Sequence, residues 1–241
     1  MRGTLKDDEY FAEKLAKINA DAARYEALVA QVIAEKGEED KGVQWGHAIL
    51  NTTYQNRINL LYTVGMKDGE IKPAFEKLLA NYAGQWNPDS SYIELIKVLS
   101  LAVLLDFNLA DGNLGKLIQK ITESSYEDYL VDRFLCYFDG NREQGSHIFR
   151  WKNSYQPLQN VIESSDGAEA VSLLKTYLEK QWLIIHRGCA WYGSHKNDKL
   201  TYYGYWSFEA AAVVKMCGLD DSSLRGQAYY PYDLVHSEAD R

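Results

Sequence analysis

Apolar residues recur every three to four positions over most of this chain, which is the spacing of an amphipathic helix. From Asp8 to Lys36 they form one stripe, and Lys, Glu and Asp side chains occupy the opposite side. Asp7 or Asp8 can accept hydrogen bonds from the first free amides, and Gly37 suits the C-terminal end. The pattern therefore predicts a long first helix followed by a charged, glycine-bounded loop at residues 37–42.

The same periodicity predicts further helices, separated by turns rich in Gly, Asn, Asp and Ser. The segment 91–107 is apolar on nearly all sides, so we expect it at the centre of the core. The chain from Gly226 to Leu234 is aromatic and contains a proline, and it is predicted to be non-helical. The helices are expected at about residues 44–64, 70–82, 91–107, 114–122, 126–138, 156–163, 168–187 and 206–217.

These elements predict an all-α fold, a multi-helix bundle in two packed lobes with an aromatic, loop-rich C-terminal segment. The turn at Glu123–Ser125 is the best candidate for a boundary, which divides the chain into lobes 1–123 and 124–241. No self-similarity at a period of about 30–45 residues is convincing, so a repeat solenoid is not expected.

Composition and charge narrow the class of protein. The 34 Asp and Glu residues outnumber the 26 Lys and Arg residues, and the net charge of −8 disfavours nucleic acid and anionic membrane as partners. The most apolar run, residues 98–105, is far shorter than the roughly 20 residues of a membrane span. The three cysteines, Cys136, Cys189 and Cys217, are too widely spaced for a disulfide framework. We therefore expect a cytoplasmic protein with reduced thiols.

The sequence contains no convincing catalytic or metal-binding motif. The five histidines are scattered, and neither a nucleophile elbow nor a phosphate-binding glycine loop occurs. His186 and Cys189 are three residues apart, but such a pair at a helix end is more often accidental than catalytic. Asp89, Glu94 and Lys97 only superficially resemble a PD-(D/E)xK nuclease site, because the spacing is ExxK. We expect no catalytic residue, no metal and no cofactor.

Tyrosine and tryptophan are unusually frequent, at 18 and 6 residues against 7 phenylalanines. The densest aromatic stretches are residues 202–208 and 229–232. Such side chains either pack helices together with their polar ends satisfied, or form the anchors of a recognition surface. The sequence alone leaves both interpretations open.

Two acidic clusters, each with a net charge of −4, accompany the aromatic stretches. An acidic cluster is usually a solvated face, and its alternative is the electrostatic steering of a basic partner. The first cluster contains Glu123, Glu127, Asp128, Asp132, Asp139 and Glu143 against Arg133 and Arg142, and the second contains Asp220, Asp221, Asp233, Glu238 and Asp240 against Arg225.

The C-terminal segment resembles the PoNi family of immunity proteins, which are built from paired N- and C-terminal domains. The resemblance rests on a GYWSxEAA element at residues 204–211 and a YYPxDL element at residues 229–234, preceded by Trp191, Tyr192 and His195. It covers roughly residues 180–235, and the N-terminal half matches only by its helical layout and by Tyr54, Asn56 and Arg57. The residues that we interpret as an architectural signature are Tyr203, Gly204, Tyr205, Trp206, Glu209 and Pro231.

The resemblance implies an immunity protein, not an enzyme, that binds and neutralises a cognate DNase toxin. Toxins of this PoNe type belong to the PD-(D/E)xK class and are polymorphic toxins delivered between bacteria by type VI and other secretion systems. An acidic, aromatic surface can fill the basic cleft of such a nuclease. The residues expected to bind the toxin are Asp220, Asp221, Tyr229, Tyr230, Tyr232 and Asp233, and in second rank Glu127, Asp128 and Asp132.

Two other classes of function stay open. The protein could be a helical adaptor or regulator without a toxin partner. Alternatively, it could be a helical hydrolase in which Glu209 acts as a general base whose pKa is raised by its aromatic surroundings. A neighbouring gene for a nuclease toxin would favour immunity, and a deep pocket centred on Glu209 would favour hydrolysis.

Overall fold

The computed structural model describes residues 1–197 and 199–236, except for the side chains of residues 152–154. Over this part of the chain the structure is helical and contains no strand, so the predicted all-α fold is confirmed. The chain forms two compact units, the first made of Met1–Trp86 with Gly193–Tyr205 and the second of Asn87–Tyr192 with the chain from Trp206. The bounds of these units differ from those of the predicted lobes, 1–123 and 124–241, and the lobe boundary at Glu123–Ser125 remains a prediction.

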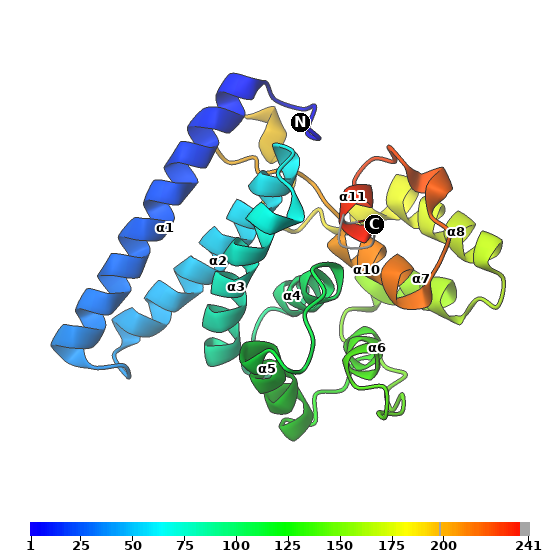
Figure 1. Ribbon diagram of the computed structural model, residues 1–241, viewed down its shortest axis with the longest axis horizontal. Helices are drawn as coiled ribbons and strands as arrows, with labels where there is room; N and C mark the ends of the chain where they lie inside the picture. The colour runs from blue at the N-terminus through cyan, green and yellow to red at the C-terminus, as the bar shows by residue number, and fades with distance from the viewer. Residues whose placement is uncertain (198, 237–241) are drawn as a thin grey trace. The chain divides into compact units, whose positions relative to one another are not determined.

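The first unit is built on three helices (Figure 1). Helices α1 (Asp8–Lys36) and α2 (Lys41–Thr63) form an antiparallel hairpin, and α3 (Asp68–Gln85) packs along α2. As predicted, Asp7 caps α1 by accepting a 2.9 Å hydrogen bond from the Tyr10 amide, and Gly37 ends the helix at φ 86°. The two helices of the hairpin approach closely at Gly46, where any side chain would collide with Val29.

A largely irregular segment, described at residues 193–197 and 199–205, returns to this unit and is hydrogen-bonded to α1 and α2. It contains one turn of 3-10 helix, η2 (Ser194–Lys196). The Tyr202 amide donates a 2.8 Å hydrogen bond to the Tyr10 hydroxyl, and the Thr63 hydroxyl donates a 3.0 Å bond to the Tyr203 carbonyl. The Lys14 ammonium donates to the Leu200 carbonyl and lies 3.8 Å from the centre of the Tyr203 ring. Helix α1 therefore holds a segment that is 186 to 192 residues away in the sequence.

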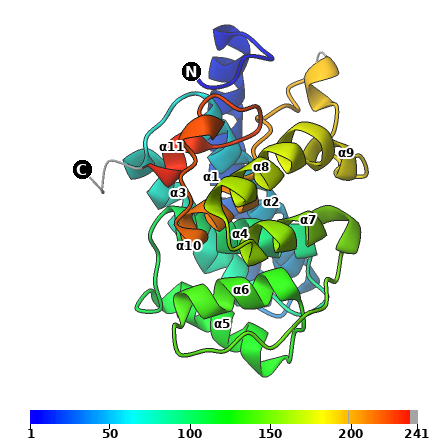
Figure 2. The same cartoon turned by 90° about the vertical axis from the view of Figure 1, so that its right-hand side faces the viewer.

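The second unit is centred on α4 (Tyr92–Leu104), as the apolar pattern predicted. The apolar side chains of α4 from Leu95 onward are fully buried, with exposed fractions of 0%. Helices α6 (Tyr129–Phe138) and α10 (Phe208–Cys217) pack against α4, and α7 (Lys152–Glu163) packs against α10 (Figure 2). The remaining longer helices of the unit are α5 (Gly112–Glu123) and α8 (Gly167–Thr176), and the latter packs against α7.

Two elements differ from the expected pattern. The helix predicted over residues 168–187 is divided into α8, a π-helical stretch η1 (Tyr177–Trp182) and a short α9 (Leu183–Ile185). The predicted non-helical tail contains a single helical turn, α11 (Tyr232–Val235), which begins after Pro231 because the proline ring already restricts φ. A 3-10 turn, η3 (Ser222–Leu224), precedes it.

Within the described residues, no helix has both the length and the apolar character that crossing a bilayer requires.

Candidate functional site

Only some residues of the second acidic cluster lie on the surface of the protein. Asp221 is buried, with an exposed fraction of 1%. The Tyr230 hydroxyl donates a 2.6 Å hydrogen bond to Asp221 Oδ2, and His236 Nε2 lies 2.6 Å from Oδ1. Tyr230 and Pro231 are buried as well. The structure therefore places these three residues inside the second unit, and Asp221 and Tyr230 do not lie on the recognition surface that the sequence suggested.

Four of the predicted binding residues in the tail do reach the surface. Asp220 and Asp233 are exposed, and Tyr229 and Tyr232 are half-buried. The Ser222 amide donates a 3.1 Å hydrogen bond to Asp220, and this bond holds the pKa of the carboxyl below its usual range.

The two tyrosines differ in their surroundings. Tyr229 adopts a positive φ of 67°, and its ring centre lies 5.0 Å from that of Trp182. The Tyr232 ring lies 5.5 Å from the Arg225 guanidinium. Glu238 and Asp240 lie outside the described residues.

In the first acidic cluster, Asp128 is an internal residue. It is fully buried at the N-terminus of α6, and its carboxylate accepts hydrogen bonds from the amides of Val131 (3.0 Å) and Arg150 (2.9 Å) and from the Tyr92 hydroxyl (2.9 Å). Burial raises the pKa of Asp128, and these hydrogen bonds partly oppose the rise. Asp128 thus joins α4, α6 and the chain before α7 within the second unit.

Asp132, one turn further along α6, is equally internal, with an exposed fraction of 4%. The Arg142 guanidinium donates to Asp132 Oδ1 through Nε (3.1 Å) and Nη2 (2.9 Å), and the amides of Gly145 (2.5 Å) and Ser146 (3.0 Å) donate to Oδ2. Burial alone would raise the pKa of Asp132, but the four hydrogen bonds lower it. Of the second-rank candidates only Glu127 is exposed.

The signature residues at Glu209 form a buried hydrogen-bond centre. Oε1 of Glu209 accepts bonds from the Trp182 indole (2.6 Å), the Ser207 hydroxyl (2.6 Å) and the Tyr177 hydroxyl (3.2 Å). Glu209 is only 6% exposed, on the first turn of α10. This arrangement supports the architectural interpretation, because the carboxylate satisfies donors that packing has buried.

The GYWSxEAA element is divided between the two compact units. Tyr203, Gly204 and Tyr205 belong to the first unit, where Gly204 adopts φ 101° and the Tyr205 hydroxyl lies 2.9 Å from His195 Nδ1. Trp206, which is half-buried, and Glu209 belong to the second unit. The positive φ explains why glycine suits this position.

The structure also reveals an exposed residue that the sequence did not single out as a site. Trp45 has an exposed fraction of 73%, higher than that of any other large apolar side chain among the described residues. The helical pattern around residue 45 is compatible with burial, so only its position beside the acidic loop 37–42 could have drawn attention to it. Among the residues that the structure describes, no three His, Cys, Asp or Glu side chains are grouped as a metal site would require.

The fold and the candidate site together define an all-α protein that uses many of its acidic and aromatic side chains for internal packing. The N-terminal family model of the PoNe immunity protein (PoNi) matches residues 2–119, and the C-terminal model of the same family matches residues 126–234. The chain therefore belongs to the PoNe immunity protein family. Membership implies immunity against a PoNe nuclease toxin and suggests a protein that is not an enzyme.

A solved structure supports the fold independently. The crystal structure of protein PA2201 from Pseudomonas aeruginosa is similar to this chain with a TM-score of 0.63, at 17% sequence identity and over 97% of each chain. At this identity the similarity concerns the fold alone. No curated protein matches the chain.

Proposed function

We propose that this protein binds a cognate DNase toxin of the PD-(D/E)xK class in the cytoplasm and so protects the cell that produces it. The observation that carries the proposal is the match of both halves of the chain to the PoNe immunity family. The toxin would be a polymorphic toxin of the kind delivered by type VI secretion.

Charge supports this proposal. A nuclease that holds DNA needs a basic cleft for the phosphates. The immunity protein carries a net charge of −8, so its field attracts a basic nuclease at long range and disfavours binding to DNA itself.

The tail surface of the second unit, formed by Asp220, Tyr229, Tyr232 and Asp233, is one proposed contact region. It combines two exposed carboxylates with two half-buried aromatic rings. Carboxylates can replace phosphates in a basic cleft, and rigid aromatic rings bury apolar area at a low cost in conformational entropy.

The test is co-purification with the product of the neighbouring gene, followed by a DNA-cleavage assay. We expect a complex of defined stoichiometry and loss of cleavage at equimolar immunity protein, and an unrelated DNase serves as the control that stays active. Failure to bind, together with undiminished cleavage, would refute the proposal and favour a helical adaptor without a toxin partner.

The hydrolase alternative gains no support from the surroundings of Glu209. A general base must reach the proton that it abstracts. Glu209 is buried, and one of its oxygens already accepts three hydrogen bonds from protein side chains.

A further inference from the structure

The α1–α2 hairpin of the first unit leaves a tryptophan in solvent. Trp45 lies in the second turn of α2 and is 73% exposed. Tryptophan has the largest apolar surface of any side chain and is enriched in the hot spots of protein interfaces.

Two further apolar side chains of the same hairpin are exposed, Ile49 at 39% and Leu28 at 48%. Trp45 and Ile49 are four residues apart on α2, so they lie on one face of that helix. Leu28 precedes Val29, the residue of α1 that meets Gly46 of α2. Leu28 and Trp45 therefore lie at the same level of the hairpin, and Ile49 lies about one turn further along α2.

Contacts with α3 show which side of the hairpin these residues occupy. On α2, His47 and Asn51 lie 2.5 and 2.6 Å from the side chain of Asn81 of α3, and on α1, Glu26 forms a 2.8 Å ion pair with Lys77 of α3. Helix residues follow one another at about 100°, so residues two apart point in nearly opposite directions.

Trp45 is two residues from His47, and Leu28 is two residues from Glu26. Both side chains consequently point away from α3, on the open side of the hairpin.

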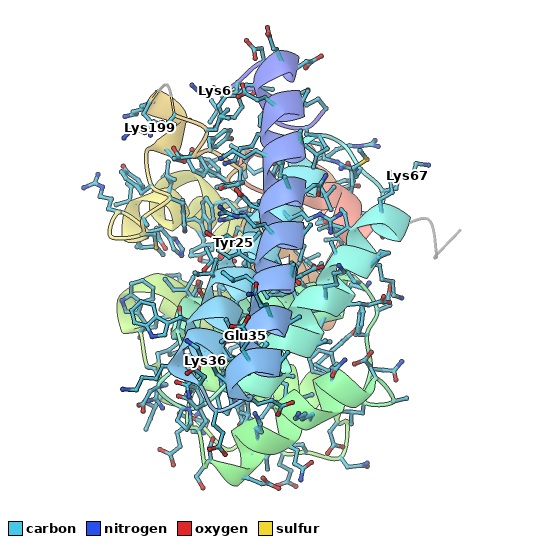
Figure 3. The ribbon with its side chains drawn as sticks, turned by 90° about the vertical axis from the view of Figure 1, so that its left-hand side faces the viewer. Lys6, Tyr25, Glu35, Lys36, Lys67 and Lys199 are labelled. Carbon is cyan, nitrogen blue, oxygen red and sulfur yellow. The ribbon has the colours of Figure 1, made fainter. Side chains whose placement is uncertain are left out.

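The open side is hollowed next to Leu28. A shallow depression of about 370 Å³ is lined by Tyr25, Leu28, Gln31 and neighbouring residues of α1. In Figure 3, Tyr25, Glu35 and Lys36 lie along the half of α1 that leads into the acidic loop. The surface is thus contoured rather than flat, which suits a protein partner.

The loop that joins α1 to α2 places negative charge beside the apolar side chains. Glu35, Glu38 and Glu39 are exposed, and Asp40 caps α2 by accepting a 2.7 Å hydrogen bond from the Gly42 amide. Against these four carboxylates, residues 35–41 contain two cations, Lys36 and Lys41, so the loop together with the adjoining helix ends carries a net charge of −2. We name Leu28, residues 35–41, Trp45 and Ile49 together the hairpin tip.

We propose that the hairpin tip docks onto a basic surface of the cognate nuclease toxin, with Trp45 as its central anchor. This inference rests on the proposed function, because the partner is the toxin. Charge complementarity favours the toxin over a second copy of this chain as the partner. The glutamates beside the apolar patch attract a surface rich in lysine and arginine, whereas another copy of this acidic chain would repel them.

The test compares the toxin affinity of Trp45→Ala with that of the parent protein. We expect Kd to rise by about thirtyfold or more, the effect of removing an interface hot spot. The melting temperature should stay at the parent value, because the side chain is exposed and buries little on folding. Tyr137→Ala is the matched control, since Tyr137 is an aromatic residue of α6 with 42% exposure and should leave Kd unchanged.

The charge of the loop is tested separately with the double variant Glu38→Lys and Glu39→Lys. Its control is the double variant Glu9→Lys and Glu13→Lys, which makes the same change in net charge at exposed positions near the other end of α1. We expect the loop variant to slow association with the toxin by about tenfold and the control to slow it much less.

The outcomes separate this inference from the proposed function. If the parent protein inhibits the nuclease and Trp45→Ala binds the toxin as tightly as the parent, the hairpin tip is not the binding surface, and the proposed immunity function is unaffected. A parent protein that neither binds nor inhibits the nuclease would overturn both. Sedimentation velocity of the free protein tests the remaining occupant, a second copy of this chain. If the parent protein is a dimer, and Trp45→Ala dissociates it without loss of toxin affinity, the hairpin tip is a self-association surface and the proposal is wrong.

Discussion

At the scale of single residues, the acidic side chains of this protein fall into two groups with different physical roles. Asp128, Asp132, Glu209 and Asp221 are buried, and each accepts hydrogen bonds from groups that folding has removed from water. Asp220, Asp233 and Glu127 are exposed. Because a buried carboxylate is costly unless it is paired, the first group stabilises the fold, and only the second is available to steer a partner.

Replacing Glu209 by alanine should destabilise the protein by about 3 kcal/mol or more, because the donors of Trp182, Ser207 and Tyr177 would lose a shared acceptor. Glu209→Gln should cost less, since one side-chain oxygen can still accept. Urea unfolding monitored by circular dichroism measures both changes. An alanine variant that unfolds like the parent but no longer inhibits a nuclease would show that Glu209 acts in function and not in architecture.

Asp221 and Asp220 are neighbours, yet we expect them to respond differently to substitution. Asp221→Ala should lower the free energy of unfolding by about 1–3 kcal/mol, because the buried Tyr230 hydroxyl loses its acceptor. Asp220→Ala should change stability much less and weaken toxin inhibition if the tail surface contributes to binding.

Melting temperature and inhibition are measured on both single variants. Equal losses of stability would contradict the distinction between the buried and the exposed aspartate.

At the scale of elements, long-range hydrogen bonds decide where the irregular segments lie. Residues 193–197 and 199–205 contain little regular structure, and side chains of α1 and α2 hold their backbone at Tyr202 and Tyr203. Burial of Lys14 beneath this segment lowers the pKa of its ammonium to about 8. The segment is thus a part of the first unit, although it follows the long helices of the second unit in the sequence.

Tyr10→Phe removes the hydroxyl that accepts from the Tyr202 amide and donates to the Tyr202 carbonyl, at 2.8 and 3.2 Å. We expect faster hydrogen exchange at residues 199–203, with unchanged protection of α4, because only the attachment to α1 is weakened. Hydrogen-exchange mass spectrometry resolves the two regions. Unchanged exchange at residues 199–203 would mean that Lys14 and Thr63 hold the segment without Tyr10.

At the scale of the whole molecule, net charge is the property that most directly concerns the partner. The excess of acidic over basic residues gives a net charge of −8. Exposed acidic residues occur in both units, with Glu38, Glu39 and Asp220 in loops and Asp233 in α11. Opposite charge on a nuclease would raise the rate of encounter, and salt would screen that attraction over about 8–10 Å at physiological ionic strength.

The association rate with the toxin should therefore fall by about tenfold or more between low and physiological salt, while the dissociation rate changes little. Stopped-flow or surface-based binding measured across this range provides both rates. An association rate that does not change with salt would show that electrostatic steering does not contribute to binding. Recognition would then depend on apolar contacts, and Trp45 would be the first residue to test.

The sequence by itself determined most of the helices of this fold, although not the π-helical stretch η1 or the short helix α11. Apolar periodicity located the helices, Asp7 and Gly37 marked the ends of α1, and the continuous apolar pattern of α4 predicted its central burial. These features are local, because helix formation and capping depend on neighbours within about one turn. The GYWSxEAA and YYPxDL elements also allowed the family resemblance to be stated from the residues alone.

Only the tertiary structure decided which charged and aromatic residues face solvent. Asp221, Asp128 and Asp132 look like surface carboxylates in a polar stretch, yet each accepts a hydrogen bond from a side chain that is 9 to 36 positions away in the chain. Trp45 looks like a core residue of an amphipathic helix, and it is exposed because Gly46 and Leu50, rather than Trp45 and Ile49, occupy the inner face of α2. Burial is set by which helix faces meet in space, and that information is distributed over the whole chain rather than present in any local pattern.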